Sequence, residues 1–169
     1  MSREAPSLFV SEGPWVLLDS LSGEDINLEG HVLYGAPERT ILRRLRGSKM
    51  RTLEGLMNEF GAALQFFDGF GENWPALSEC LAYLDEWMKG DSYILIFNQA
   101  TELLADDELE ARTLLRILNK TGEWWSRPII DNGAFNRPAI PFHSILQVHP
   151  GEEKTIRHRF GEIPSLRRI

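Results

Sequence analysis

Hydrophobic and polar positions alternate along this chain in two ways, one typical of strands and one typical of helices. Five short stretches predict strands: four are mainly apolar, and one, TILRRLR, alternates imperfectly between apolar and charged residues. The fourth, SYILIF, is apolar throughout, which is typical of a central strand covered on both faces. The predicted strands are residues 15–18, 31–34, 40–46, 92–97 and 141–148.

Apolar residues three and four positions apart predict helices between these strands. Thr52 is expected to cap a helix that runs to about residue 65. Asn73 is expected to cap the next helix, because its side-chain oxygen can accept a hydrogen bond from a free backbone N–H. Trp74, with leucines at 77, 81 and 84, forms the apolar face of this second helix. We expect it to end near residues 89–90, with Gly90 in a left-handed C-terminal cap.

Two further helical stretches follow the apolar SYILIF strand. Residues 100–105 predict a short helix. Asp107, with Glu110 three residues later, has the spacing of a capping box at the start of a helix that reaches about residue 125. This pattern predicts four inward-facing residues: Leu109, Leu114, Ile117 and Leu118. Trp74 and Trp87 are expected in the core, whereas the adjacent Trp124 and Trp125 cannot both face inward, so one of this pair is expected at the surface.

Strands separated by helices require crossover connections, which favour a parallel sheet in an α/β fold. We expect three core strands, at 40–46, 92–97 and 141–148, with N-terminal strands that could extend one edge or form a small hairpin. The predicted organisation is an N-terminal extension (1–37), a central domain (38–150) and a basic C-terminal tail (151–169). The tail is expected either to be loosely held or to fold back on acidic residues.

Composition limits the possible functions of the chain. With 43% hydrophobic and 25% charged residues it resembles an ordinary globular protein. Its formal net charge of −7 argues against nucleic acid as a direct partner. No apolar run is long enough for a membrane span or a secretory signal, so we expect no membrane association and a cytoplasmic location.

The negative charge is concentrated in one segment, residues 66–110. This segment holds eleven acidic residues and a single base, Lys89, which gives it a formal charge of −10. Such a segment can be an ordinary solvated surface, or it can attract a cationic partner. The acidic residues are Asp68, Glu72, Glu79, Asp85, Glu86, Asp91, Glu102, Asp106, Asp107, Glu108 and Glu110.

The residues offer little support for catalysis. No nucleophile motif or phosphate-binding loop is present, and the four histidines are scattered. Cys80, the single cysteine, lies near the apolar face of its helix and is expected to be a buried, inert thiol. A catalytic dyad of Cys80 with His143 is conceivable, but no motif in the sequence around either residue supports it. We therefore expect no enzyme activity, no cofactor and no metal.

The stretch GENWPALSECL, residues 71–81, resembles the loop and second-helix signature of the barstar-like ribonuclease inhibitors. Residues 51–60 are similar to the first helix of that family, and residues 93–97 to its central strand. The resemblance implies an α/β domain with a three-stranded parallel sheet, no catalysis, and a basic secreted ribonuclease or toxin nuclease domain as partner. It also implies that the loop before the second helix, together with that helix, blocks the nuclease active site.

The resemblance assigns seven residues to the binding face. Glu79 stands where the family has its most important aspartate, and Glu72 and Asn73 match the signature. Pro75 replaces another aspartate and Ser78 a tryptophan, which leaves open a barstar-fold binding module with a non-nuclease partner. The complete implied set is Asp68, Phe70, Glu72, Asn73, Pro75, Ser78 and Glu79.

Overall fold

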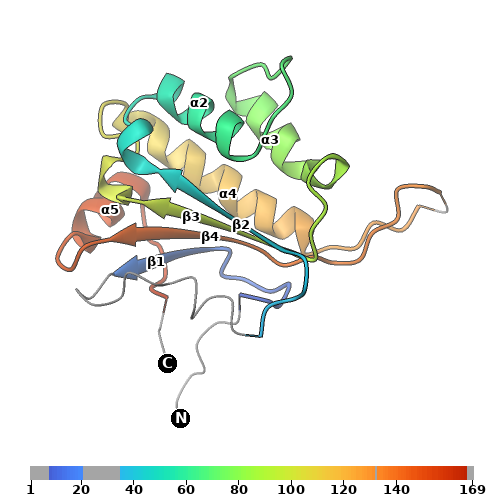
Figure 1. Ribbon diagram of the computed structural model, residues 1–169. Coiled ribbons are helices and arrows are strands. Elements are labelled where there is room, and N and C mark those ends of the chain that lie inside the picture. The colour runs from blue at the N-terminus through green and yellow to red at the C-terminus, as the bar shows by residue number, and fades with distance from the viewer. Residues whose placement is uncertain (1–7, 21–34, 132, 167–169) are drawn as a thin grey trace, which may run out of the picture.

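A four-stranded parallel sheet forms the centre of the molecule (Figure 1). The computed structural model describes residues 8–20, 35–131 and 133–166 of the 169-residue chain. Within them the strand order is β1-β4-β3-β2, so β2 and β1 lie at the two edges. The strands are β1 (Val16–Ser20), β2 (Thr40–Arg46), β3 (Ser92–Asn98) and β4 (Phe142–Val148).

This arrangement confirms the predicted α/β fold with a parallel sheet. The sheet has four strands because β1 pairs with β4, in addition to the three strands that the resemblance implies. The N-terminal strand predicted at 15–18 therefore extends one edge of the sheet, as one of the two expectations stated. The strand predicted at 31–34 lies outside the described residues.

Helices cover one face of the sheet (Figure 1). They are α2 (Leu53–Ala63), α3 (Trp74–Ala82), α4 (Ala111–Trp125) and α5 (Glu153–Phe160). The largest fully buried side chains include Trp125 of α4, whose ring lies 5.1 Å from that of Tyr93 on β3. Phe142 of β4 stacks on the same tyrosine at 5.4 Å, so aromatic contacts fix α4 across the two central strands.

The opposite face of the sheet has a smaller apolar cluster. Ile94 and Ile96 of β3, Leu17 of β1 and Ile145 of β4 are all fully buried there. Leu8 joins the same cluster from the segment before β1. Both β3 and β4 are buried on both faces, which explains the continuous apolar run of β3.

Four short 3₁₀ helices complete the described elements. They are η1 (Gly47–Lys49), η2 (Leu84–Glu86), η3 (Ala100–Glu102) and η4 (Glu108–Glu110). The helix predicted over residues 100–105 is thus only a single 3₁₀ turn. No helix among the described residues is long and apolar enough to cross a membrane.

Helix α3 is shorter than predicted. It ends at Ala82 and is followed by η2, so the chain does not continue as one helix to residue 90. The predicted left-handed cap at Gly90 is wrong, because Gly90 is not among the residues with positive φ. Glycine is needed there for space, since a Cβ atom at this position would lie 2.7 Å from Cγ1 of Ile41. The Gly90 N–H donates to the Tyr93 hydroxyl at 3.1 Å.

The predicted capping box at Asp107 and Glu110 is also wrong. Helix α4 begins at Ala111, and Asp107 makes no side-chain capping bond to the turn that follows it. Its carboxylate accepts a hydrogen bond from the Leu53 N–H at 2.7 Å, so it caps α2, a helix 54 positions away. Leu109, predicted to face inward, is 97% exposed because it lies in η4 before the helix begins.

Trp87 differs from the prediction as well. It lies after η2 and is 37% exposed, although its Nε1 donates to the Leu64 carbonyl at 2.9 Å. By contrast, the adjacent pair behaves as expected, with Trp125 buried and Trp124 at the surface.

The described part of the C-terminal tail folds back on the body of the protein. Its helix α5 buries Ile156 and Phe160 in the main core. Arg159 forms an ion pair with Glu108 and donates to the carbonyls of Thr101 and Leu103. The tail therefore contacts the acidic segment, as one of the two expectations stated.

Candidate protein-binding face

The loop between α2 and α3, residues 65–73, is held firmly at its start. Helix α2 ends in a Schellman motif, in which Gln65 adopts a left-handed conformation with φ 55°. The Phe66 N–H closes this motif by donating to the Gly61 carbonyl at 2.9 Å. The Phe66 ring then packs edge-on against Phe70 at 4.8 Å and Trp87 at 6.0 Å. These contacts fix the loop on the helices.

The end of the same loop is fixed by the cap of α3. Asn73 is the N-cap, as predicted, and its Oδ1 accepts a hydrogen bond from the Ala76 N–H at 2.9 Å. Its Nδ2 donates to the Gly71 carbonyl at 3.0 Å, so both ends of the amide hold backbone. Immediately before it, Glu72 adopts a left-handed conformation with φ 49°, which is unusual for a residue with a Cβ atom.

Helix α3 is also tied to the start of α4. The Trp74 Nε1 donates to a Glu110 carboxylate oxygen at 2.8 Å. The apolar side of α3 buries Leu77, Cys80 and Leu81, which leaves the opposite side open to solvent. The loop and helix thus form one supported unit.

The structure places the seven predicted binding residues on this unit, with different exposures. Five are exposed, whereas Phe70 and Ser78 are half-buried. Phe70 packs against Phe66 and the main core, so it supports the loop as well as lining it. Asn73 uses its amide to cap α3. The exposed five are Asp68, Glu72, Asn73, Pro75 and Glu79.

The acidic segment divides into carboxylates that have partners within the protein and carboxylates that do not. Arg51 forms ion pairs with Glu102 and with Asp106, and Arg39 pairs with Asp91 at 2.7 Å. Hydrogen bonds from Arg51 lower the pKa of Asp106 below its ordinary value. Most acids between residues 91 and 110 are therefore engaged inside the molecule.

The remaining acids lie on the loop, on α3 and just after it. In the described part of the chain, four of them are exposed and form no ion pair or side-chain hydrogen bond. They are Asp68, Glu72, Glu79 and Glu86. Since three of them lie on the supported unit and Glu86 lies in η2 directly after it, the free negative charge of the acidic segment is concentrated at the face that the sequence singled out.

Cys80 lies directly beneath this face. It is a free cysteine that is 5% exposed. Burial, with a smaller contribution from the neighbouring Glu79 carboxylate, raises the pKa of the thiol. A thiol that stays protonated is a poor nucleophile. Within the described ranges, no group of three or more His, Cys, Asp or Glu side chains is placed to hold a metal ion.

Comparison with known families decides the relationship of this chain to other proteins. The family model described as Barstar (barnase inhibitor) matches residues 40–146. The chain belongs to the barstar family. The match runs from β2 to β4 and includes the loop and α3. Barstar-family proteins are inhibitors and not enzymes, and the family implies binding to a ribonuclease. A search of curated proteins found no match.

Two features of this barstar-family chain were missed by reasoning from the sequence. The bond between Trp74 and Glu110 joins residues 36 positions apart, and no local pattern indicates it. Tyr83 lies one turn after Glu79, is 47% exposed and contacts the ring of Trp124. The one indication of this aromatic contact in the sequence was the adjacent Trp124–Trp125 pair, which required one tryptophan at the surface.

Proposed function

We propose that this chain inhibits a basic ribonuclease by placing carboxylates of its loop and α3 in the nuclease active site. The observation that supports this most directly is the set of four exposed, unpaired acids, three on the supported unit and one, Glu86, just after it. A ribonuclease active site must be cationic because it holds phosphates, and carboxylates can accept the same charge-assisted hydrogen bonds. Glu72 and Glu79 are the proposed phosphate mimics.

The support beneath these residues favours tight binding. Asn73 holds the start of α3, and the Phe66 cluster holds the loop, so little backbone freedom remains to be lost on association. Unpaired surface acids also accelerate the encounter with a cationic partner, an effect that salt weakens. We propose no catalytic role for any residue, no cofactor and no direct contact with nucleic acid. We also propose a cytoplasmic location, where an inhibitor of this kind would protect cellular RNA.

The test is inhibition and binding against a panel of purified basic microbial ribonucleases that includes barnase. The wild-type chain should block RNA cleavage by at least one member and bind it in a salt-sensitive manner. Glu72→Gln and Glu79→Gln should each slow association and weaken its salt dependence, because each removes one charge without shortening the side chain. Glu162→Gln is the control, since this exposed glutamate follows α5, outside the acidic segment, and its one ion pair, to Arg157, is long at 3.9 Å.

Two results would count against this function. If both variants bind the inhibited nuclease as the wild type does, the acidic face is not the binding face. If no member of the panel is bound or inhibited, a non-nuclease partner is favoured. That second candidate is motivated by Pro75 and Ser78, which replace an aspartate and a tryptophan expected from the family resemblance.

A further inference from the structure

Beyond Glu79, the solvent-facing side of α3 is followed by an aromatic surface. Tyr83 follows Glu79 by one turn, with its N–H donating to the Glu79 carbonyl at 3.1 Å. Its ring meets that of Trp124, from the end of α4, with centroids 6.4 Å apart. The Trp124 Nε1 donates to the Ala82 carbonyl at 3.0 Å, and Trp124 is 41% exposed. The acidic and aromatic surfaces therefore share α3.

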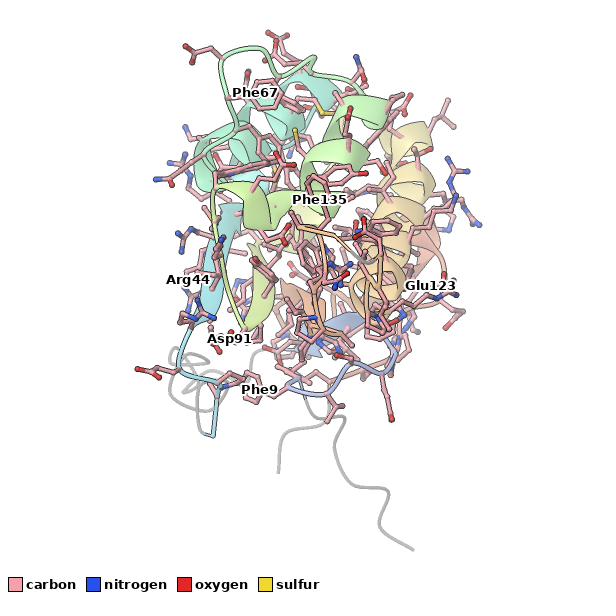
Figure 2. The ribbon with its side chains drawn as sticks, turned by 90° about the vertical axis from the view of Figure 1, so that its right-hand side faces the viewer. Phe9, Arg44, Phe67, Asp91, Glu123 and Phe135 are labelled. Atoms are coloured by element: carbon pink, nitrogen blue, oxygen red, sulfur yellow. The ribbon has the colours of Figure 1, made fainter. Side chains whose placement is uncertain are left out.

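A projecting arm adds more apolar surface at the same end of α4. This arm, residues 127–131 and 133–139, leaves the body on the side where α3 and α4 end (Figure 1). Its two sides are joined by a pair of backbone hydrogen bonds between Ile129 and Arg137. Ile130 is 81% exposed and Phe135 is 75% exposed. Figure 2 looks at this side of the molecule, with Phe135 in front of the helices and Phe67 at the upper edge.

Arg137 fixes the arm to the helix. Its guanidinium lies 4.3 Å above the Trp125 ring and 5.8 Å from that of Trp124. It donates to the carbonyls of Trp124 at 3.2 Å and Arg127 at 2.9 Å. A single side chain thus satisfies the C-terminal end of α4 and the base of the arm together, so the arm is held in place before any partner arrives.

A hollow lies where the arm joins α4. Its volume is about 460 Å³. Trp124 and Ile129 contribute apolar walls, and the ion pair between Glu123 and Arg127 lies at the same place. Of the exposed aromatic and apolar residues named above, Trp124 lines this hollow. Several large exposed apolar side chains on neighbouring elements are typical of a protein contact surface, whereas single exposed apolar residues are ordinary.

We propose that Tyr83, Trp124, Ile130 and Phe135, here called the arm patch, form a second contact surface for the same ribonuclease. This inference rests on the proposed function and extends it: the acids occupy the cationic cleft, and the arm patch packs on an apolar area beside that cleft. Tyr83 lies one turn after Glu79 and contacts Trp124. A single partner that binds Glu79 can therefore also contact Tyr83.

Charge argues against a second copy of this chain as the occupant. Pairing two arm patches would bring two sets of unpaired acids near each other, since Glu79 and Glu86 flank Tyr83. Like charges brought together in this way oppose association. A basic protein has the opposite effect, because its charge complements Glu79 and Glu86 beside Tyr83.

The first experiment places a photo-crosslinking residue at matched aromatic positions in the full chain. Phe67→p-benzoylphenylalanine reports on the acidic loop, Phe135→p-benzoylphenylalanine reports on the arm, and Val10→p-benzoylphenylalanine is the control from the segment before β1. Each variant is irradiated with each ribonuclease of the panel. Crosslinking of positions 67 and 135 to the same nuclease, without crosslinking at position 10, is the expected result.

The other outcomes separate this inference from the proposed function. Crosslinking at 67 alone would overturn the arm patch and leave the inhibitor function intact. A crosslink from 135 to a second copy of the chain would overturn the choice of occupant. If neither 67 nor 135 reaches any ribonuclease, the proposed function fails and the arm patch fails with it.

Kinetics provide the second test. The double variant Ile130→Ser with Phe135→Ser should dissociate about tenfold faster from the bound ribonuclease, as expected for loss of apolar anchors. The salt dependence of association should not change, because no charge is removed. Val10→Ser is the control, as Val10 is also partly exposed. An unchanged dissociation rate in the double variant would refute the arm patch.

Discussion

Glu72 provides a test in which stability and binding should change in opposite directions. Its φ of 49° is a conformation that costs an ordinary L-residue about 1–2 kcal/mol, whereas glycine adopts it freely. Glycine also increases the entropy of the unfolded chain, which costs about 0.5–1 kcal/mol. Glu72→Gly should therefore raise the free energy of unfolding by a net of about 0.5–1 kcal/mol. It should at the same time weaken binding to the ribonuclease, because a proposed phosphate mimic is removed.

The backbone contribution can be isolated by comparing variants. Glu72→Ala removes the same charge but keeps a Cβ atom, so the difference between the two variants measures the conformational term alone. Urea unfolding with linear extrapolation gives this difference, and thermal unfolding should place the glycine variant about 1–4 °C above the alanine variant. Binding to the inhibited member of the panel should be weakened similarly in both.

Gln65 supplies a matched control for the stability effect. It has nearly the same conformation, with φ 55°, but carries no charge. Gln65→Gly should stabilise the protein to a similar extent while leaving ribonuclease binding unchanged. The reasoning is refuted if Glu72→Gly is no more stable than Glu72→Ala, or if the glycine variant inhibits the ribonuclease as well as the wild type does.

Three further predictions concern contacts that support the fold. Asp107→Ala should lower the free energy of unfolding by about 1 kcal/mol in urea denaturation, because the Leu53 N–H loses its cap. Arg137→Ala should cost about 2 kcal/mol, and Arg137→Lys should not restore it, since an ammonium cannot reach several carbonyls at once. Hydrogen bonds from Arg46 lower the pKa of the buried Glu59, so the stability it contributes is present above its ordinary pKa of 4.5 and is lost as pH falls through the lowered value. Acid unfolding of Glu59→Gln should lack this component, and an identical pH profile would contradict it.

The features that could be predicted from the sequence are those set by neighbouring residues. Thr52 and Asn73 cap helices through bonds to N–H groups three residues later, so a short stretch of sequence contains the whole interaction. Strand β3 was evident because both of its faces are covered, which makes its sequence a continuous apolar run. The presence of an acidic loop and helix was evident from charge counting.

The features that could not be predicted depend on residues far apart in the chain. Asp107 has the spacing of a cap for the helix that follows it, yet its carboxylate accepts a hydrogen bond from the first N–H of α2. Counting charges could not show which acids remain free, because Arg51 reaches Glu102 and Asp106 across more than fifty positions. No local pattern indicates the arm, since its attachment requires Arg137 to lie over the tryptophan at the end of α4.

The division of the acidic segment explains how one highly charged stretch can serve both folding and binding. Carboxylates such as Asp106 and Glu110 meet donors within the protein and hold elements together. Glu79 faces water, where an exposed charge costs little to leave unpaired. Its interaction energy therefore remains available for a cationic partner, and the engaged acids keep its helix from moving when that partner binds. Affinity should depend on how few carboxylates the protein leaves unpaired and how firmly it holds them, more than on the total negative charge of the segment.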